Sequence, residues 1–296
     1  MPAVIRKTCS LLALSAALLD GADPKPSGAL DIVHSGAYSE PAGFHASARI
    51  LDWNIDRGKH LEGIRALMRG LQPDLCVFQE VDLGARRTHE RDIARQLAQD
   101  FKMNFAFAPE FRELGQSTSD GAAYQGQAIL SKLPIRSSRI LRFERQSGFW
   151  KPQPFLLSSL AIMQRREGGR IAQVSELENG DGMIVVYNLH LESRAREATR
   201  LAQLDEALAD AARYPAETPL IIAGDFNTMS RHSPLVDRLR AAGYRSAFGG
   251  KRQRTHLLIG ALDWVFVRGA VQLHDASVIR DAHASDHFPI FVDARF

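Results

Sequence analysis

Ionisable side chains end several of the apolar segments in this sequence of 296 residues. The segment SDHFP places Asp286 and His287 directly before the apolar ending FPIFVDARF, and GDFN places Asp225 after the apolar run PLIIA. Because Asp and His beside Ser and Pro are also ordinary turn residues, one such segment alone does not identify a site. Together, however, they supply the carboxylates and imidazoles that enzymes use to move protons and to hold cations.

The alternation of side chains along a strand groups these polar residues onto common faces. In LDWNID, Asp52, Asn54 and Asp56 share one face of a predicted strand, and the residues between them are apolar. Buried-strand sequence precedes every such group, so we expect the strand ends to meet at one rim of the fold. The same spacing of two residues, or the same position at the end of an apolar strand, identifies six further candidates: Glu80, Asn188, His190, Glu192, Asp225 and Asn227.

Four carboxylates of this kind need a cation if they meet in one place. Glu80, Asp225, Asp263 and Asp286 would repel one another and lose hydration without a counter-ion. Oxygen ligands without cysteine favour Mg²⁺ or Mn²⁺, and Mg²⁺ leaves water and substrate phosphate to complete its octahedron. The residues therefore predict a Mg²⁺ or Mn²⁺ site, with the remaining acid and the histidines free to move protons and contact phosphate oxygens.

Apolar periodicity predicts alternating strands and helices from residue 48 onward. The segments ARILDWNI and DLCVFQEV are predicted strands on either side of the helical pattern HLEGIRALMRGL. We expect a second helix in THERDIARQLAQDF with Thr88 as its N-cap, and a hairpin turn at NGDG. Two halves of similar layout predict an α/β fold in which two sheets pack face to face with helices outside.

The first 46 residues differ from the rest of the chain. Arg6 and Lys7 precede a mostly apolar run, which is the layout of a secretory signal, and a docked N-terminal helix is the alternative. We expect residues 1–46 to form this segment and a linker rich in Pro, Gly and Ser, and residues 47–296 to form one domain. No run reaches the roughly 18 apolar residues of a membrane span, so we expect no transmembrane segment, and the location is either cytoplasmic or exported.

Composition excludes several classes of protein. With 45% apolar and 24% charged residues, the chain is expected to be globular. A net charge of +3 is compatible with a phosphate-bearing substrate but does not by itself indicate nucleic acid. The only two cysteines, Cys9 and Cys76, exclude a disulfide framework and a cysteine zinc site. We expect a monomer.

Six motifs in order resemble those of the endonuclease/exonuclease/phosphatase superfamily. They are LDWNID, FQEV, NLHLE, GDFN, LDWVFV and SDHFP, and the resemblance covers residues 47–296. It implies a DNase I-like four-layer α/β sandwich, in which two packed mixed β-sheets are flanked by helices. The segment HLES, followed by Arg200 and Gln203, is similar to the tyrosyl-DNA phosphodiesterase branch and to bacterial members.

The resemblance also implies a set of metal-site residues. Glu80 is the implied principal metal carboxylate, with Asn54 beside it. Asp286 is implied to lie near the metal or its water. The implied cofactor is Mg²⁺ or Mn²⁺, in agreement with the oxygen-rich composition of the site.

A second set of implied residues would perform the chemistry. His190 is implied to contact the phosphate, and Asp225, oriented by Asn227, to activate water or assist the leaving oxygen. Asp263 and His287 are the implied Asp–His pair, in which Asp263 holds His287 so that an N–H points at a phosphate oxygen.

Four further residues are candidates for substrate binding. Gln127 stands where many relatives have Asn, so we consider Tyr124 as the second phosphate contact. Arg145 and Trp150 belong to RILRFERQSGFWKPQPF, residues 139–155, where basic and aromatic residues alternate as suits a nucleic-acid strand. A lipid-facing loop or a completed core would use the same residues. Arg200 either binds substrate or covers a helix face.

The expected function is that of a divalent-metal-dependent phosphodiesterase or nuclease, which hydrolyses a P–O bond by in-line attack of an activated water. The substrate is a phosphodiester, and a nucleic acid is one candidate. Two alternatives remain: a phospholipid or inositol-phosphate hydrolase of the same fold, and a catalytically silent phosphate-binding module. The loops around the rim set the choice of substrate, and no motif in them names it.

Overall fold

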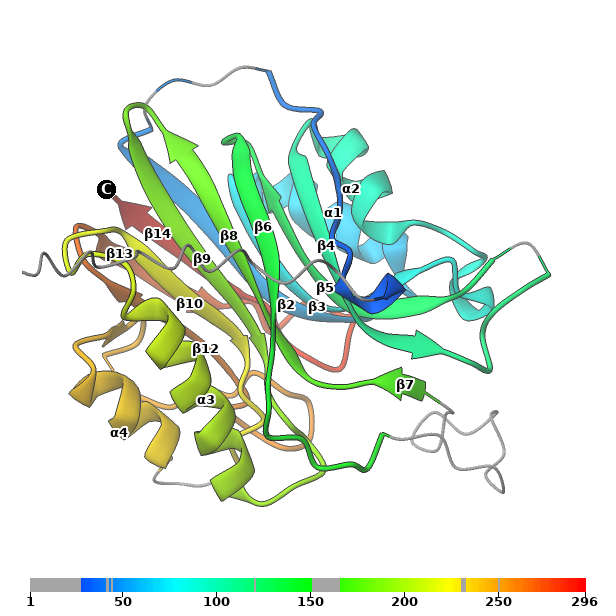
Figure 1. The fold of residues 1–296 in the computed structure, drawn as a ribbon. Helices are drawn as coiled ribbons and strands as arrows, with labels where there is room; N and C mark the ends of the chain where they lie inside the picture. The colour runs from blue at the N-terminus through cyan, green and yellow to red at the C-terminus, as the bar shows by residue number, and fades with distance from the viewer. Residues whose placement is uncertain are drawn as a thin grey trace, which may run out of the picture.

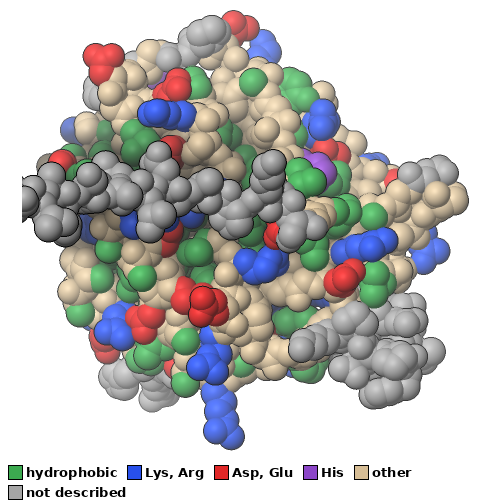
Figure 2. Space-filling model, in the orientation of Figure 1, with side chains coloured by type: hydrophobic (Ala, Val, Ile, Leu, Met, Phe, Trp, Pro, Cys, Tyr) green, Lys and Arg blue, Asp and Glu red, His purple; other side chains and the backbone are tan. Residues whose placement is uncertain are grey.

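The computed structural model describes residues 28–40, 43, 45–119, 121–150, 166–229, 233–249 and 251–296. The signal-like run, and residues 151–155 of the basic and aromatic segment, lie outside the described residues. Within the described part of the chain, no helix is long and apolar enough to cross a membrane. On the face that Figure 2 shows, basic side chains lie among acidic ones.

Eight strands form the first sheet, in the order β1-β4-β5-β3-β2-β14-β13, with β7 paired to β4. The strand β2 is parallel to β3 and antiparallel to β14, so the sheet is mixed. Its strands are β1 (His34–Gly36), β2 (Ser47–Arg57), β3 (Leu75–Leu83), β4 (Asn104–Glu113), β5 (Tyr124–Ser131), β7 (Arg166–Gly168), β13 (Gln272–Val278) and β14 (Ile290–Arg295).

Six strands form the second sheet, in the order β11-β12-β10-β9-β8-β6. It is mixed as well, because β10 is parallel to β9 and antiparallel to β12. Its strands are β6 (Ile135–Arg142), β8 (Ile171–Asn179), β9 (Gly182–His190), β10 (Leu220–Asp225), β11 (Arg245–Ser246) and β12 (Asp263–Arg268).

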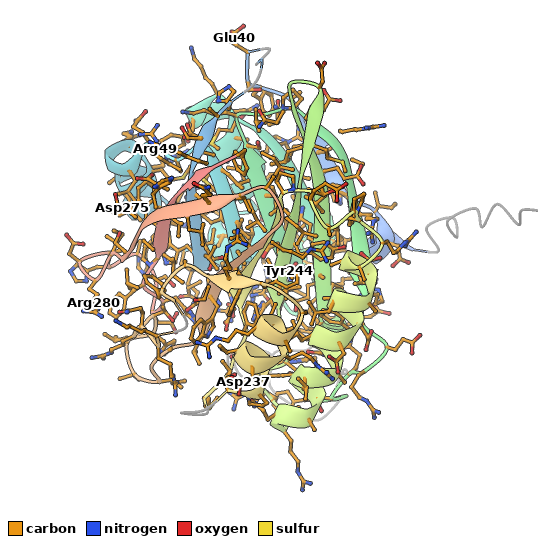
Figure 3. The ribbon with its side chains drawn as sticks, turned by 90° about the vertical axis from the view of Figure 1, so that its left-hand side faces the viewer. Glu40, Arg49, Asp237, Tyr244, Asp275 and Arg280 are labelled. Atoms are coloured by element: carbon orange, nitrogen blue, oxygen red, sulfur yellow. The ribbon has the colours of Figure 1, made fainter. Side chains whose placement is uncertain are left out.

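Helices cover the outer faces of both sheets, as Figures 1 and 3 show. The helices α1 (Leu61–Leu71) and α2 (Ile93–Phe101) pack on the first sheet, and α3 (Glu197–Ala211) and α4 (Pro234–Ala241) pack on the second. Two short 3-10 helices, η1 (Ala29–Asp31) and η2 (Arg86–Thr88), lie in connecting segments. The arrangement of helix, sheet, sheet and helix confirms the predicted four-layer α/β sandwich.

The period-two pattern of the strands explains why three apolar layers form. In β2, Leu51, Trp53 and Ile55 pack against the helices α1 and α2, whereas Ile50 faces the second sheet. Between the sheets, Ile50 packs in one cluster with Val77 from β3 and with apolar residues of β9, β10 and β12. A strand buried on both faces is apolar at most positions, so polar residues gather toward the strand ends, although buried ones such as Asp52 and Gln127 also lie within strands.

Two local expectations have different outcomes. The hairpin at NGDG is confirmed, because β8 and β9 pair up to Asn179 and Gly182, and Gly180 adopts a φ of 61°. The N-cap assignment of Thr88 is wrong: the helix begins at Ile93, and Asp92 caps it by accepting the N–H of Arg95. Thr88 instead ends η2 and donates its hydroxyl to Asp82, which is buried and already paired with a guanidinium.

Candidate active site

The polar strand ends of the two sheets meet at one rim. Asn54 lies near the end of β2 in the first sheet, and its amide donates to Asp225 Oδ2, at the end of β10 in the second sheet, over 3.2 Å. Asp225 is opposite Asp263 and beside His190 in the strand register. Below this rim, Gln79 donates to Asp52 and to Asn188, and so joins the sheets by a buried polar contact.

Asp225 lies at the centre of the polar rim. Its Oδ2 is 3.7 Å from Nε2 of His190 and 3.8 Å from Nε2 of His287. All three side chains are buried, with at most 6% of each residue exposed. Two imidazole nitrogens therefore flank one carboxylate in a site shielded from bulk water.

The motif GDFN holds Asp225 in this place. A Cβ at Gly224 would lie 2.0 Å from the carbonyl oxygen of Leu189, so only glycine allows β9 and β10 to approach this closely. Asn227, in the left-handed region with a φ of 50°, donates its backbone N–H to Asp225 Oδ1 over 2.9 Å. Its side-chain amide instead donates to the carbonyl of Leu191. Asn227 thus orients Asp225 through the backbone.

The segment SDHFP places His287 opposite Asp263. His287 Nδ1 lies 2.9 Å from Asp263 Oδ2, and the backbone carbonyl of His287 accepts the indole N–H of Trp53 over 2.8 Å. The hydroxyl of Ser285 donates to the carbonyl of Asn54. Burial alone would lower the pKa of His287, but the carboxylates of Asp263 and Asp225 outweigh it and raise this pKa to about 10.

We expect His287 to titrate near pH 10 in the folded protein. Its ordinary pKa is 6.5, so the carboxylates stabilise the fold fully below pH 6.5, and this contribution is lost as the pH rises from 6.5 to about 10. Asp263→Asn removes one of these charges and should move the midpoint down. The ring resonances of His287, followed by NMR across this pH range in both proteins, measure both values; a wild-type midpoint near 6.5 contradicts the expectation.

A second acid–histidine pair was not predicted from the sequence. His190 Nδ1 lies 3.3 Å from Oε2 of Glu110, which is fully buried on β4. Arg170 donates to the other oxygen of Glu110 over 2.8 Å. The sequence signal for this pair is the position of Glu110, an acid inside the otherwise mostly apolar run NFAFAPEF. Each of the two histidines therefore has its Nε2 near Asp225 and its Nδ1 near a second carboxylate.

Glu80 occupies a strained position at the same rim. The pairing of β3 with β5 shifts between Phe78 and Val81, and Glu80 in this bulge adopts a φ of 50°. Its Oε2 lies 3.2 Å from Nη2 of Arg57 and accepts the amide of Gln125 over 3.1 Å. Although burial opposes the charge, the positive groups nearby, Arg57 above all, hold the pKa of Glu80 well below its usual range. Glu80 is therefore ionised.

Asp286 lies on the more open side of the rim, beside a histidine that the sequence did not reveal. Its Oδ2 is 3.5 Å from Nε2 of His256, and its side chain is 57% exposed. His256 Nδ1 accepts the backbone N–H groups of Leu258 and Ile259, so the neutral ring carries its proton on Nε2, toward Asp286. This hydrogen bond lowers the pKa of Asp286.

Oxygen ligands suitable for a hard cation are present at Glu80, Asn54 and Asp286. The two carboxylates have lowered pKa values, and the charge of Glu80 acts on Asp286. Among the described residues, two other groups, His256 with Asp286 and His287, and Asp225 with Asp263 and His287, have ligand atoms within 4.8 Å of one another. Both include His287, whose Nδ1 faces Asp263 and whose raised pKa keeps the ring protonated, so they suit a metal less well.

Two of the four predicted substrate contacts have structural roles instead. Tyr124 points to the helix side of its strand and packs against the core between the first sheet and the helices. The centres of its ring and of the His34 ring are 6.4 Å apart. It is the neighbouring residue, Gln125, that faces Glu80. Arg200 is buried, pairs with Glu197, and donates to the carbonyls of Glu192 and Ala195. The structure thus favours the alternative in which Arg200 covers a helix face, because its guanidinium holds the loop before α3 by hydrogen bonds.

The basic and aromatic segment divides between the core and the rim. Arg139 and Arg142 lie on β6 and pair with Asp210 and Asp31, and Phe143 is buried. Trp150 is half-buried: its indole donates to Glu192, and its ring lies near two buried guanidinium groups. Arg145 is exposed. Arg145 and Trp150, which the sequence suggested, therefore remain candidates for substrate contact, and Phe149 beside them is 45% exposed.

A buried ion-pair network supports the strand ends around Glu80. Arg87 lies between the fully buried carboxylates of Asp82 and Glu113, at 2.6 and 3.2 Å. Removing the arginine leaves two buried acids facing each other, so Arg87→Met should lower the free energy of unfolding by about 3–5 kcal/mol. Arg238→Met, which breaks an exposed pair with Asp205, should cost at most about 1 kcal/mol. Urea unfolding measures both; equal losses contradict the argument.

The arrangement of this site on two packed sheets agrees with the comparison with known families. Residues 53–287 match the Endonuclease/Exonuclease/phosphatase family, so the chain belongs to this family. Its members are in general hydrolytic phosphoesterases that depend on a divalent metal. No curated protein sequence matches the chain.

Solved structures of low sequence identity share the fold. The human Nocturnin catalytic domain with bound sulfate is 18% identical, with a TM-score of 0.66 over 86% of this chain and 96% of that one. An endonuclease/exonuclease/phosphatase from Beutenbergia cavernae is 17% identical, with a TM-score of 0.63 over 85% and 72% of the two chains. D. rerio TDP2 in complex with a single-stranded DNA product is 16% identical, with a TM-score of 0.57 over 85% and 100%.

Proposed function

We propose that this protein is a divalent-metal-dependent phosphodiesterase that hydrolyses a P–O bond by in-line attack of water. The observation that carries the proposal is the buried carboxylate of Asp225 between the Nε2 atoms of His190 and His287. A phosphate placed there would meet a proton acceptor and two imidazole groups at once. The family membership supports phosphoester chemistry in general, and the DNA complex of D. rerio TDP2 makes nucleic acid one candidate substrate.

Glu80, Asp286 and Asn54 would hold the metal, which we propose to be Mg²⁺ or Mn²⁺. When bound, such an ion supplies positive charge for the phosphate oxygens. Glu80 is suited to this because it is ionised and because the strained bulge fixes its direction. The polar contacts from Arg57 and Gln125 keep the carboxylate in place.

The remaining residues would orient the substrate and move protons. Asp225 takes a proton from water, or gives one to the leaving oxygen, while Asn227 holds its other oxygen. His287 stays protonated in the neutral pH range and offers its Nε2–H to a non-bridging oxygen, where charge grows in the transition state. His190, backed by Glu110, contacts the phosphate from the other side of Asp225.

The proposal is tested with two soluble chromogenic esters. We expect Mg²⁺-dependent release of nitrophenol from bis(p-nitrophenyl) phosphate, faster than from p-nitrophenyl phosphate, because the proposed substrate is a diester. A chelator should abolish the reaction, and added Mg²⁺ or Mn²⁺ should restore it. Folded protein that turns over neither ester at any metal concentration contradicts the proposal and favours a silent phosphate-binding module.

A further inference from the structure

One loop at the rim exposes three consecutive large aliphatic side chains. Leu257, Leu258 and Ile259 are 50%, 85% and 48% exposed, whereas most large apolar residues described in the structure are buried. Single exposed apolar residues are normal on protein surfaces, but contiguous ones mark interaction sites. The three lie between His256 and the strand that begins at Asp263, so they border the candidate active site.

Hydrogen bonds to the site hold the backbone of this loop. Leu257 donates its N–H to the carbonyl of Asp286 over 2.8 Å. Leu258 and Ile259 donate theirs to the ring of His256 over 3.0 and 3.1 Å. Because these contacts use the backbone and leave the side chains outside, the loop presents a fixed apolar tip whose ordering cost is already met before a partner binds.

Two other exposed apolar side chains lie on loops at the same end of the sheets. Met229, 51% exposed, follows the motif that contains Asp225 and Asn227. Phe149, 45% exposed, packs edge-on against Trp150, whose indole donates to Glu192 just beyond the end of β9. The end of the molecule that carries the candidate site therefore also carries these apolar side chains.

Basic residues accompany the apolar tip. Lys251, Arg252 and Arg254 precede it in the segment KRQRTHLLIG, and Arg254 donates to the carbonyls of His256 and Leu257. Arg194 lies 5.6 Å from the ring of Phe149. Aliphatic side chains flanked by basic ones suit the boundary between acyl chains and anionic headgroups. Stacking on unpaired bases requires aromatic rings, which the tip lacks, so a bilayer fits it better than a nucleic-acid strand.

We propose that Leu257, Leu258 and Ile259 insert into an anionic phospholipid bilayer, and that the substrate is a phosphodiester in the headgroup layer. This substrate class rests on the proposed phosphodiesterase function, whereas the membrane contact does not. In the reaction, water forms a new P–O bond and one ester P–O bond breaks, so that an alcohol leaves with a proton and a phosphate monoester remains. The reaction needs no further reactant.

The membrane contact is tested by flotation of the whole protein with vesicles of equal parts phosphatidylcholine and phosphatidylserine. Replacing all three tip residues by Ser should weaken vesicle binding by about 1000-fold, since each buried aliphatic side chain contributes about tenfold. Ile32→Ser is the matched control, because Ile32 is 49% exposed on the N-terminal segment, and it should bind as the wild type does. Lys251→Gln should weaken binding to these vesicles but not to phosphatidylcholine alone.

Two further measurements separate this inference from the proposed function. The triple variant should hydrolyse bis(p-nitrophenyl) phosphate as fast as the wild type, but should release less headgroup product from vesicles. A wild type that binds vesicles but hydrolyses no soluble diester contradicts the proposed function and leaves the membrane contact standing. If the triple variant melts at a lower temperature, Leu258→Ser alone replaces it, with an expected loss of about tenfold.

Three results would overturn the membrane contact. The first is a wild type that does not float with anionic vesicles, and the second is a triple variant that floats equally well. The third is a triple variant that differs from the wild type only in binding single-stranded DNA or in self-association, measured by light scattering. That result would assign the tip to nucleic acid or to a second copy of the chain.

Discussion

We expect Asp225→Asn to lower kcat on bis(p-nitrophenyl) phosphate by about 10²–10⁴-fold, the usual range for a general acid–base group, with a small change in KM. Asn has nearly the same shape, and its one side-chain oxygen can still accept the backbone N–H of Asn227, whereas the hydrogen bond from the amide of Asn54 is lost. It cannot take up a proton. The loss should therefore fall on the chemical step and leave the fold intact.

The matched control for this variant is Asp237→Asn. Asp237 is an exposed acid on α4, as Figure 3 shows, and its side chain is 71% exposed. It should leave kcat unchanged. Steady-state kinetics and a melting curve for both variants complete the comparison. If Asp225→Asn loses less than about tenfold while remaining folded, Asp225 is not the group that moves the proton.

Glu80→Gln is expected to have the second large effect, a loss of at least about tenfold in both rate and Mg²⁺ affinity. The substitution keeps the size of the side chain and lets Gln125 and Arg57 still donate to an oxygen. It removes the charge that the lowered pKa of Glu80 maintains. The rate should recover in part at high Mg²⁺ concentration, because the other proposed ligands remain.

Binding of Mn²⁺ followed by electron paramagnetic resonance measures the same change without catalysis. The free Mn²⁺ signal should disappear at lower protein concentration for the wild type than for Glu80→Gln. Glu62→Gln, which alters an exposed acid on α1, is the control and should match the wild type. A Glu80→Gln variant with an unchanged metal titration places the ion elsewhere, and the groups that contain His287 then become the candidates.

The strands, the helices and the order of the motifs could be predicted from the sequence because they depend on local patterns. Apolar runs with period two or 3.6 mark the elements, and polar residues of a buried strand are expected chiefly at its ends. That constraint is local, and it singles out Asn54, Glu80, His190 and Asp225 as site candidates. The fold then brings Asn54 and His190 to Asp225.

Only the tertiary structure decided which residues contact and orient those side chains. The local sequence of Glu110 and His256 does not show which side chains they face, and their roles arise because β4 and the loop before β12 meet the rim. Tyr124 shows the same limit. The alternation along β5 puts Tyr124 and Gln125 on opposite faces. Which of the two faces is directed toward Glu80 depends on the side of β5 that the second sheet covers.

The same reason explains Arg200 and the basic residues of β6. A sequence shows that a guanidinium is present, but the position of its nearest acid or carbonyl is a property of chain segments far apart. Arg139 and Arg142 find Asp210 and Asp31 only after the fold has formed. The sequence by itself therefore determined the family and the layers, and it supplied the candidate groups at the strand ends. Packing between distant segments decided their partners and their protonation, because both depend on distances that no local pattern encodes.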